Sequence, residues 1–211
     1  MVSDSSKKWL ARQKKDRFVK MAKEEGLRSR AVYKLRDIQE KEACITPGMH
    51  VLELGAAPGS WTNEMRGWVG EGGKIIAVDT LPMQPVGQVT CVQHDITTDS
   101  YWKWQESFFS SATINAVVSD IAPNKTGDKR TDQLRQELVC ECVCDIAESL
   151  LCENGVMLMK TFHGTGFDRL LKRLRLTYKQ VKVMKPDASM RSKHEVYLVA
   201  TGFQNPSVKE S

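Results

Sequence analysis

The chain has 211 residues, which suits one α/β domain with a full core and falls short of two ordinary domains. No apolar run reaches the roughly 18 to 20 residues that span a bilayer, and the first residues lack the apolar stretch of a secretory signal. The formal net charge is +5, but residues 1–36 and 169–193 each carry +8, which leaves an acidic body of −11. This distribution favours a partner with a phosphate backbone, although two solvated helical faces explain charge alone equally well.

The N-terminal segment is also basic enough to resemble a mitochondrial presequence. Acidic residues interrupt it, at Asp4, Asp16, Glu24 and Glu25, and its cations favour lysine. We therefore expect a cytoplasmic protein with no membrane association.

The first predicted helix begins near Ser29, which can cap it, and its apolar positions follow a helical period at Ala31, Val32, Leu35 and Ile38. After a turn at 46–48, strand-like runs recur at 50–54, 74–79, 89–95, 114–120 and 155–160, and helical stretches fall at 60–69, 130–150 and 166–176. This alternation predicts βαβ units, a parallel sheet and strands buried on both faces.

Two further strands, at 180–184 and 195–203, are separated only by the basic loop KPDASMRSKH. No helix fits in that gap, so the last strand should return antiparallel. We predict a Rossmann-like α/β fold with a mostly parallel seven-stranded sheet. The chain should form one domain, 1–211, with a basic extension and helix at 1–36 and a tail at 204–211.

The turn GAAPGSW at 55–61 follows the first strand and opens a helix, a pattern that usually cradles a nucleotide. It lacks the Lys-Ser/Thr pair of a phosphate-binding loop, and Ala57 stands where a dinucleotide fingerprint needs a second glycine. A nucleoside that carries a carboxylate instead of phosphates fits such a turn, and S-adenosylmethionine is that kind of molecule. A tight turn of small residues, used only for packing, is the alternative.

Polar residues stand at the carboxyl ends of four strands, where open α/β sheets bind ligands. Asp79 lies 24 residues after Gly55, where an acidic group takes ribose hydroxyls, and Asp95 can accept from an exocyclic amino group. Asp120 and Lys160 follow on the next two strands. Each alone can be a solvated strand end, but four on one rim indicate a site.

If the last strand is antiparallel, its first residue, Glu195, lies at the same edge as Asp120 and Lys160. Lys34, on the first helix, can join them from above. The six cysteines contain no CxxC pair, so we expect buried thiols of a reducing compartment and no metal site.

The motifs GAAPGSW, VDTLPM, HDIT, SDIAPN, MLMKTFHG and RSKHEVYLVATGF occur in this order. Together with the basic N-terminal segment, they resemble the FtsJ-type heat-shock ribose 2′-O-methyltransferases of bacterial large-subunit (23S) ribosomal RNA. The likeness covers about residues 5–203. One departure is Ser60, where the family commonly has a second glycine.

The resemblance implies a catalytic set of Lys34, Asp120, Lys160 and Glu195. It implies S-adenosyl-L-methionine as cofactor, with contacts from Gly55, Gly59, Trp61, Asp79, Asp95 and Asp120. The implied substrate is a uridine ribose in the loop of large-subunit RNA that meets the aminoacyl end of tRNA, within the assembled 50S subunit. We expect a monomer that needs no metal.

A ribose hydroxyl must be aligned with the methyl group and must lose a proton. Lys160 is the candidate for this proton-side role, and we expect Glu195 to position it. The neighbouring charges leave open whether Lys160 is a true base or an orienting donor. We expect the RNA backbone to lie on segment 1–36 and on the loop around Arg191.

Several rival functions share parts of this pattern. The nearest are the same chemistry on tRNA, on organellar large-subunit RNA or on an mRNA cap. An assembly factor that has lost catalysis is disfavoured by the intact Lys-Asp-Lys-Glu set, and a small-molecule methyltransferase is disfavoured by the basic segments.

Overall fold

The computed structural model describes residues 16–110, 113–189, 192 and 194–204. Its seven strands form one sheet in the order β3-β2-β1-β4-β5-β7-β6. β7 pairs antiparallel with β5 and β6, while the recorded pairs among the first five strands are parallel. The predicted mostly parallel seven-stranded sheet with a reversed last strand is therefore confirmed.

The strands and helices follow the alternation that the sequence predicts. The strands are β1 (His50–Leu54), β2 (Lys74–Asp79), β3 (Thr90–Gln93), β4 (Ile114–Ser119), β5 (Leu151–Phe162), β6 (Tyr178–Met184) and β7 (Glu195–Phe203). The helices are α2 (Arg17–Glu24), α3 (Val32–Glu42), α4 (Ser60–Val69), α5 (Asp99–Phe108), α6 (Lys129–Leu150) and α7 (Phe167–Thr177), with a 3₁₀ turn, η1 (Asp187–Ser189).

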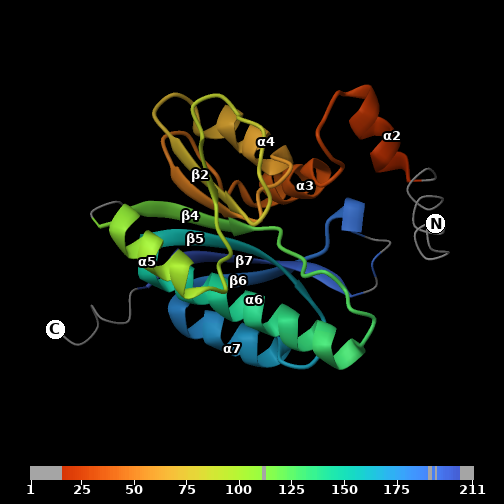
Figure 1. Ribbon diagram of the computed structural model, residues 1–211, viewed down its shortest axis with the longest axis vertical. Helices are drawn as coiled ribbons and strands as arrows, with labels where there is room; N and C mark the ends of the chain where they lie inside the picture. Colours follow the sequence, from red (N-terminus) through yellow and green to blue (C-terminus); the bar gives the residue numbers. More distant parts are fainter. Residues whose placement is uncertain (1–15, 111–112, 190–191, 193, 205–211) are drawn as a thin grey trace.

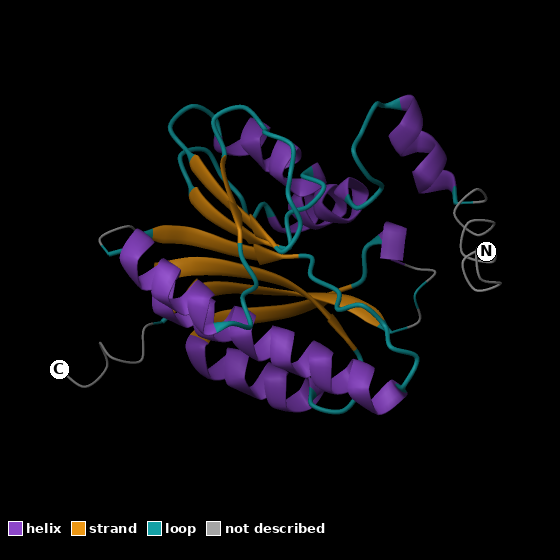
Figure 2. Cartoon of the chain, viewed as in Figure 1, coloured by secondary structure: helices purple, strands orange, loops and turns teal. Residues whose placement is uncertain are grey.

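Two helical layers enclose the sheet. α3 and α4 cover one face, and α5, α6 and α7 cover the other, while α2 lies beyond α3 (Figure 1). Alternate residues of each central strand enter the two cores: Leu158 and Tyr197 face α3 and α4, whereas Met157 and Leu198 face the other layer. Figure 2 shows the same three layers by element type.

Several expectations about these elements need correction. The helix expected from Ser29 is α3, which begins at Val32, and Ser29 does not cap it. The Ser29 hydroxyl accepts from the N–H of Ala31, the N-cap residue of α3. The sequence patterns also missed α2 and α5.

The edge strands β3 and β6 are largely exposed, so only the central strands are buried on both faces. Edge strands have a neighbour on one side only, and helices cover them incompletely.

All six cysteines are free thiols. Four of them are buried, as expected, but Cys91 is exposed and Cys152 is half-buried. Among the described residues, no helix is long and apolar enough to cross a bilayer.

Candidate active site

Strand register brings three polar side chains to one level of the sheet. Ser119 pairs with Met159, so Asp120, the next residue, lies level with Lys160. On the other side of β5, Lys160 pairs directly with Tyr197 of β7. Because side chains alternate along a strand, Lys160 and Tyr197 project from the same face, the one that α3 and α4 cover.

Two ion pairs hold the four predicted catalytic residues, which we call the Lys–Asp–Lys–Glu cluster. Lys160 Nζ lies 3.0 Å from Asp120 Oδ1 and also donates to the Asp120 backbone carbonyl. Lys34 Nζ lies 2.8 Å from Glu195 Oε1. The two lysine side chains are only 8% and 6% exposed, so both cations sit away from bulk water. The structure thus brings together all four residues.

Asp120 keeps its negative charge in this setting. Burial alone would raise its pKa, but the Lys160 and Lys34 cations and the hydrogen bond from Tyr197 hold the pKa below its ordinary value. The Tyr197 hydroxyl donates to Asp120 Oδ1 at 2.5 Å. Burial and the Asp120 and Glu195 carboxylates raise the pKa of Tyr197, so this hydroxyl remains a donor.

Glu195 is held differently from the expectation. Its recorded ion pair is with Lys34, whereas the sequence predicts that it positions Lys160. Its Oε1 also accepts a 2.5 Å hydrogen bond from the buried hydroxyl of Ser189. Glu195 therefore fixes the lysine on α3, and Asp120 fixes the lysine on β5.

Sequence reasoning missed Tyr197 and Ser189. For Tyr197 a signal existed: it stands two residues after Glu195, so in a strand it must project from the same face. Ser189 carried no such signal, because only the fold of the connection between β6 and β7 brings it to Glu195.

The glycines of the predicted cofactor turn are required by their surroundings. Gly55 has φ +78°, and a Cβ there would lie 2.5 Å from Ile121 Cγ1. Gly59, at φ +92°, is the N-cap of α4, and a Cβ would lie 2.5 Å from a guanidinium nitrogen of Arg28. The first N–H groups of α4 have no intrahelical acceptor and are available to an anion.

Arg28 connects the N-terminal segment to this turn. Its guanidinium donates to the carbonyl of Pro58 in the turn and to the carbonyls of Gln84 and Pro85 after β2, at 3.0 to 3.2 Å. Sequence reasoning did not single out Arg28. Its role depends on a loop about 57 residues away, which no local pattern predicts.

Asp79 and Asp95 retain acceptor capacity for a ligand. Asp79 accepts from the Ala57 and Leu81 N–H groups, each at 2.8 Å, so it also holds the turn in shape. Asp95 Oδ1 accepts from both the N–H and the hydroxyl of Thr97. A carboxylate offers about four acceptor sites. Asp79 also accepts from the Thr80 hydroxyl at 3.4 Å, which leaves one site for a ribose hydroxyl, and Asp95 keeps room for an amino group.

The Trp61 side chain is committed to the core. It is buried, its indole N–H donates to the Ala31 carbonyl at 2.8 Å, and its ring packs 5.8 Å from the Tyr197 ring. The backbone N–H of Trp61, in the first turn of α4, is the group that remains for a cofactor.

Glu53, inside the apolar run of β1, is a buried acid that sequence reasoning left aside. It is 2% exposed and accepts a 2.6 Å hydrogen bond from the Thr62 hydroxyl. Burial raises its pKa to about 8; the bond from Thr62 opposes this shift, while the Asp120 and Asp79 carboxylates add to it. Glu53 is therefore protonated at neutral pH.

Glu53→Gln should change how stability depends on pH. The folded pKa of Glu53 lies above the ordinary value of 4.5, so its stabilising protonation is complete below about pH 4.5 and is lost as pH rises through about 8. Between these values each pH unit costs the wild type up to about 1.4 kcal/mol, which the glutamine avoids. Urea unfolding of both cofactor-free proteins at pH 5.5, 6.5 and 7.5 should show the wild type losing stability relative to the variant. Parallel curves would mean that Glu53 is ionised in the fold.

The reversed last strand and the glycine turn after β1 are features of an α/β methyltransferase, the class to which the family match assigns the chain. The chain belongs to the FtsJ-like methyltransferase family, whose profile matches residues 27–203. Members of this family use S-adenosyl-L-methionine, which is therefore the methyl donor of this enzyme. The turn, the anion-accepting end of α4 and the free acceptor sites of Asp79 and Asp95 fit that molecule.

Solved structures share the fold. A Plasmodium falciparum protein assigned as a ribosomal RNA methyltransferase matches with a TM-score of 0.74 and 24% identity, over 84% of this chain and 99% of that one. Aeropyrum pernix fibrillarin, which holds S-adenosyl-L-methionine, matches with a TM-score of 0.58 and 18% identity, over 82% of this chain and 74% of that one. A Clostridium thermocellum protein assigned as an rRNA methylase matches with a TM-score of 0.54 and 16% identity, over 80% of this chain and 97% of that one.

Proposed function

We propose that this enzyme transfers the methyl group of S-adenosyl-L-methionine to the 2′-oxygen of a ribose in large-subunit ribosomal RNA. The observation that carries the proposal is the buried Lys–Asp–Lys–Glu cluster, in which each lysine is paired with its own carboxylate at the edge of the sheet that bears the cofactor turn. We propose a uridine of the loop that meets the aminoacyl end of tRNA as the acceptor, within the assembled 50S subunit. The protein would act as a cytoplasmic monomer and would need no metal, because no phosphate is transferred.

The cofactor supplies a methyl group on a positively charged sulfur, which is already activated for transfer. The protein must hold the 2′-oxygen in line with it and take up the hydroxyl proton. Lys160 is our candidate for this task, because it is buried and fixed by the Asp120 carboxylate. As the ammonium ion of this pair it can orient the 2′-oxygen; to take up the hydroxyl proton it must first have released one of its own to solvent. Lys34, fixed by Glu195, would hold the ribose from the opposite side.

RNA as the substrate is supported by the two basic segments. Ion pairs within the chain do not distinguish them: Arg17 and Arg36 of the first segment pair with carboxylates, as do Arg173 and Lys182 of the second. We expect the RNA backbone to lie on segment 1–36, of which residues 1–15 lie outside the described part, and on the loop around Arg191, which also lies outside it.

Changing Lys14, Lys15 and Arg17 to glutamate should weaken RNA binding and leave cofactor affinity alone. For each phosphate that the variant no longer neutralises, the slope of log affinity against log salt should fall by about one unit. Lys14 and Lys15 lie outside the described residues; Arg17 is exposed at the start of α2. A matched control changes Lys172, Arg175 and Lys179, exposed residues of α7 and β6, to glutamate. The control should keep the slope of the wild type. A wild-type slope in the Lys14, Lys15 and Arg17 variant would mean that the N-terminal charge is a solvated face.

The substrate class is tested by competition among RNAs. The protein is incubated with methyl-labelled cofactor and undermethylated large subunits, free large-subunit RNA or tRNA, and the label is mapped. We expect labelling of the large subunits at a single ribose. Label that enters tRNA in preference would replace the ribosomal assignment with the tRNA alternative.

A further inference from the structure

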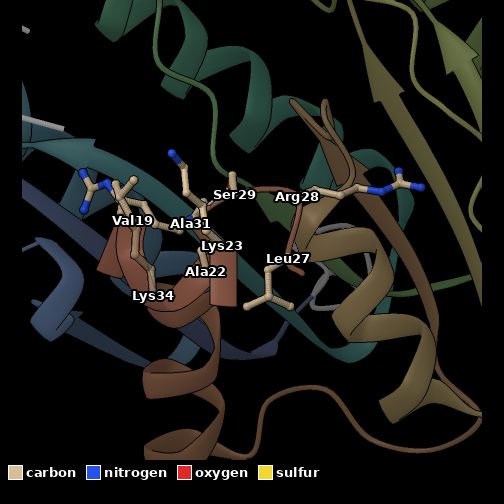
Figure 3. A pocket seen from close by; sticks show the side chains of 9 residues that line it. Val19, Ala22, Lys23, Leu27, Arg28, Ser29, Ala31 and Lys34 are labelled. Carbon is tan, nitrogen blue, oxygen red and sulfur yellow. Dashed lines mark hydrogen bonds between the residues drawn. The ribbon is translucent and has the colours of Figure 1, made fainter. Parts of the chain in front are cut away.

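A pocket lies between α2, the segment 27–31 and the start of α3 (Figure 3). It has a volume of about 410 Å³, and its walls include Val19, Ala22, Lys23, Leu27, Arg30 and Lys34. Ligand pockets of this size accept a small organic molecule. Of the residues that line it, the function proposed above gives a role at the reacting ribose only to Lys34.

The pocket adjoins the Lys–Asp–Lys–Glu cluster through Lys34. This lysine contributes to the pocket wall, and its Nζ is ion-paired with Glu195. A molecule in the pocket therefore contacts the same side chain that we assign to the acceptor ribose. The pocket and the cluster can hold two parts of one ligand.

The lining divides into an apolar wall and a basic rim. Val19, Ala22 and Leu27 are apolar, and none of the residues that line the pocket is acidic. Among the described residues, Lys23 has no recorded carboxylate partner. This combination suits a molecule with a flat uncharged part and a negative charge, which describes a nucleotide of an RNA strand.

The walls are fixed before any ligand arrives. Asp16, the buried N-cap of α2, pairs with Arg30 at 3.3 Å, and Arg30 also donates to the Ala188 carbonyl. Arg28 extends away from the other lining side chains (Figure 3) and donates a hydrogen bond to the cofactor turn. These contacts hold α2 in place relative to α3 and the turn, so the pocket is preorganised.

We infer that this pocket receives the base of the acceptor nucleotide, extruded from the RNA, while its ribose lies at Lys34 and Lys160. The inference rests on the proposed function and deepens it. Enzymes that act on a stacked nucleotide commonly swing it out and hold its base in a pocket. The apolar wall would take the face of the base, and Lys23 would take an adjoining phosphate.

A double-mutant cycle tests the inference, once the methylated position has been mapped. Val19→Phe fills the pocket from the protein side, and an abasic acceptor nucleotide empties it from the RNA side while keeping the 2′-hydroxyl. We expect each change to lower kcat/KM at least about 10-fold, and the two together to lower it little further, because they remove the same interaction. An abasic neighbouring nucleotide should instead combine multiplicatively with Val19→Phe.

Two controls keep the outcome clear. Met21→Phe alters an exposed residue of the same helix that does not line the pocket, and it should behave as wild type. Cofactor affinity by calorimetry should be unchanged in Val19→Phe, which establishes that the fold is intact. A variant that does not fold is replaced by a photocrosslink from a reactive base at the acceptor position, which should map to residues 19–31.

Independent, multiplicative effects of Val19→Phe and the abasic acceptor would overturn the inference, as would wild-type kinetics of Val19→Phe or a crosslink confined to another part of the chain. The proposed function fails in a different way. If the wild-type enzyme places no methyl group on any RNA ribose, the function itself is wrong. If it methylates RNA but the cycle shows no coupling, only the pocket assignment falls.

Discussion

Lys160→Ala should lower the single-turnover rate of methyl transfer by at least about 10²-fold, the lower end of what a positioned proton-transfer group contributes. The protein should still fold, because Tyr197 and Lys34 continue to stabilise the Asp120 carboxylate. Cofactor affinity should stay close to wild type, since the turn at 55–61, Asp79 and Asp95 lie on other strand ends. Binding to the RNA particle should also persist, because one buried lysine adds little to backbone attraction.

The rate is measured with undermethylated large subunits and saturating enzyme. Glu195→Ala should lose less activity, because its recorded ion pair is with Lys34 and not with Lys160. Lys160→Arg separates the two possible roles, since an arginine stays protonated. It should retain substantial activity if Lys160 only orients the oxygen, and little if Lys160 takes the proton. A Lys160→Ala enzyme with near wild-type rates would end the catalytic assignment.

Asp79→Ala should weaken binding of S-adenosyl-L-methionine by about 1.5–3 kcal/mol, the order of losing hydrogen bonds to a charged group. This corresponds to a rise in Kd of roughly 10- to 150-fold. The aspartate is expected to take the ribose hydroxyls, and it also accepts from the Ala57 and Leu81 N–H groups that shape the turn. The alanine removes both the contact with the ribose hydroxyls and the support of the turn, and each loss weakens binding of the cofactor.

Calorimetry measures the affinity, and Asp79→Asn is the matched variant. The asparagine keeps one acceptor oxygen and the shape of the side chain, so it should lose less affinity than the alanine. Unchanged affinity in Asp79→Ala would place the ribose-binding group elsewhere in the structure.

The central part of the fold was predictable because its strands have simple periodic patterns. β1, β2 and β7 begin and end at the predicted residues, since buried apolar runs bounded by turns leave few alternatives. β5 runs from Leu151 to Phe162 and so extends beyond the predicted 155–160. Its first residues were not predicted because Glu153 and Asn154 interrupt the apolar pattern there. α2 and α5 were missed, since both are short and mix polar with aromatic residues.

The candidate site divides in the same way. Strand topology alone predicts that Asp120, Lys160 and Glu195 meet, and the structure places them together. Which carboxylate holds which lysine depends on side-chain geometry across the α3–β7 interface, and the sequence pattern gave the wrong partner for Glu195. Ser189 and Arg28 act through loops whose path no periodicity encodes.

In the proposed function, the Lys–Asp–Lys–Glu cluster directs a methyl group to a ribose 2′-oxygen of RNA. The most direct measurement digests the labelled large-subunit RNA with alkali, which cuts the backbone after every nucleotide except one with a methylated 2′-oxygen. We expect the label from the wild-type enzyme to remain in an alkali-resistant dinucleotide at one position, and Lys160→Ala to leave that position unlabelled under the same conditions. Label recovered on a base in single nucleotides, or no label on RNA at all, would contradict it.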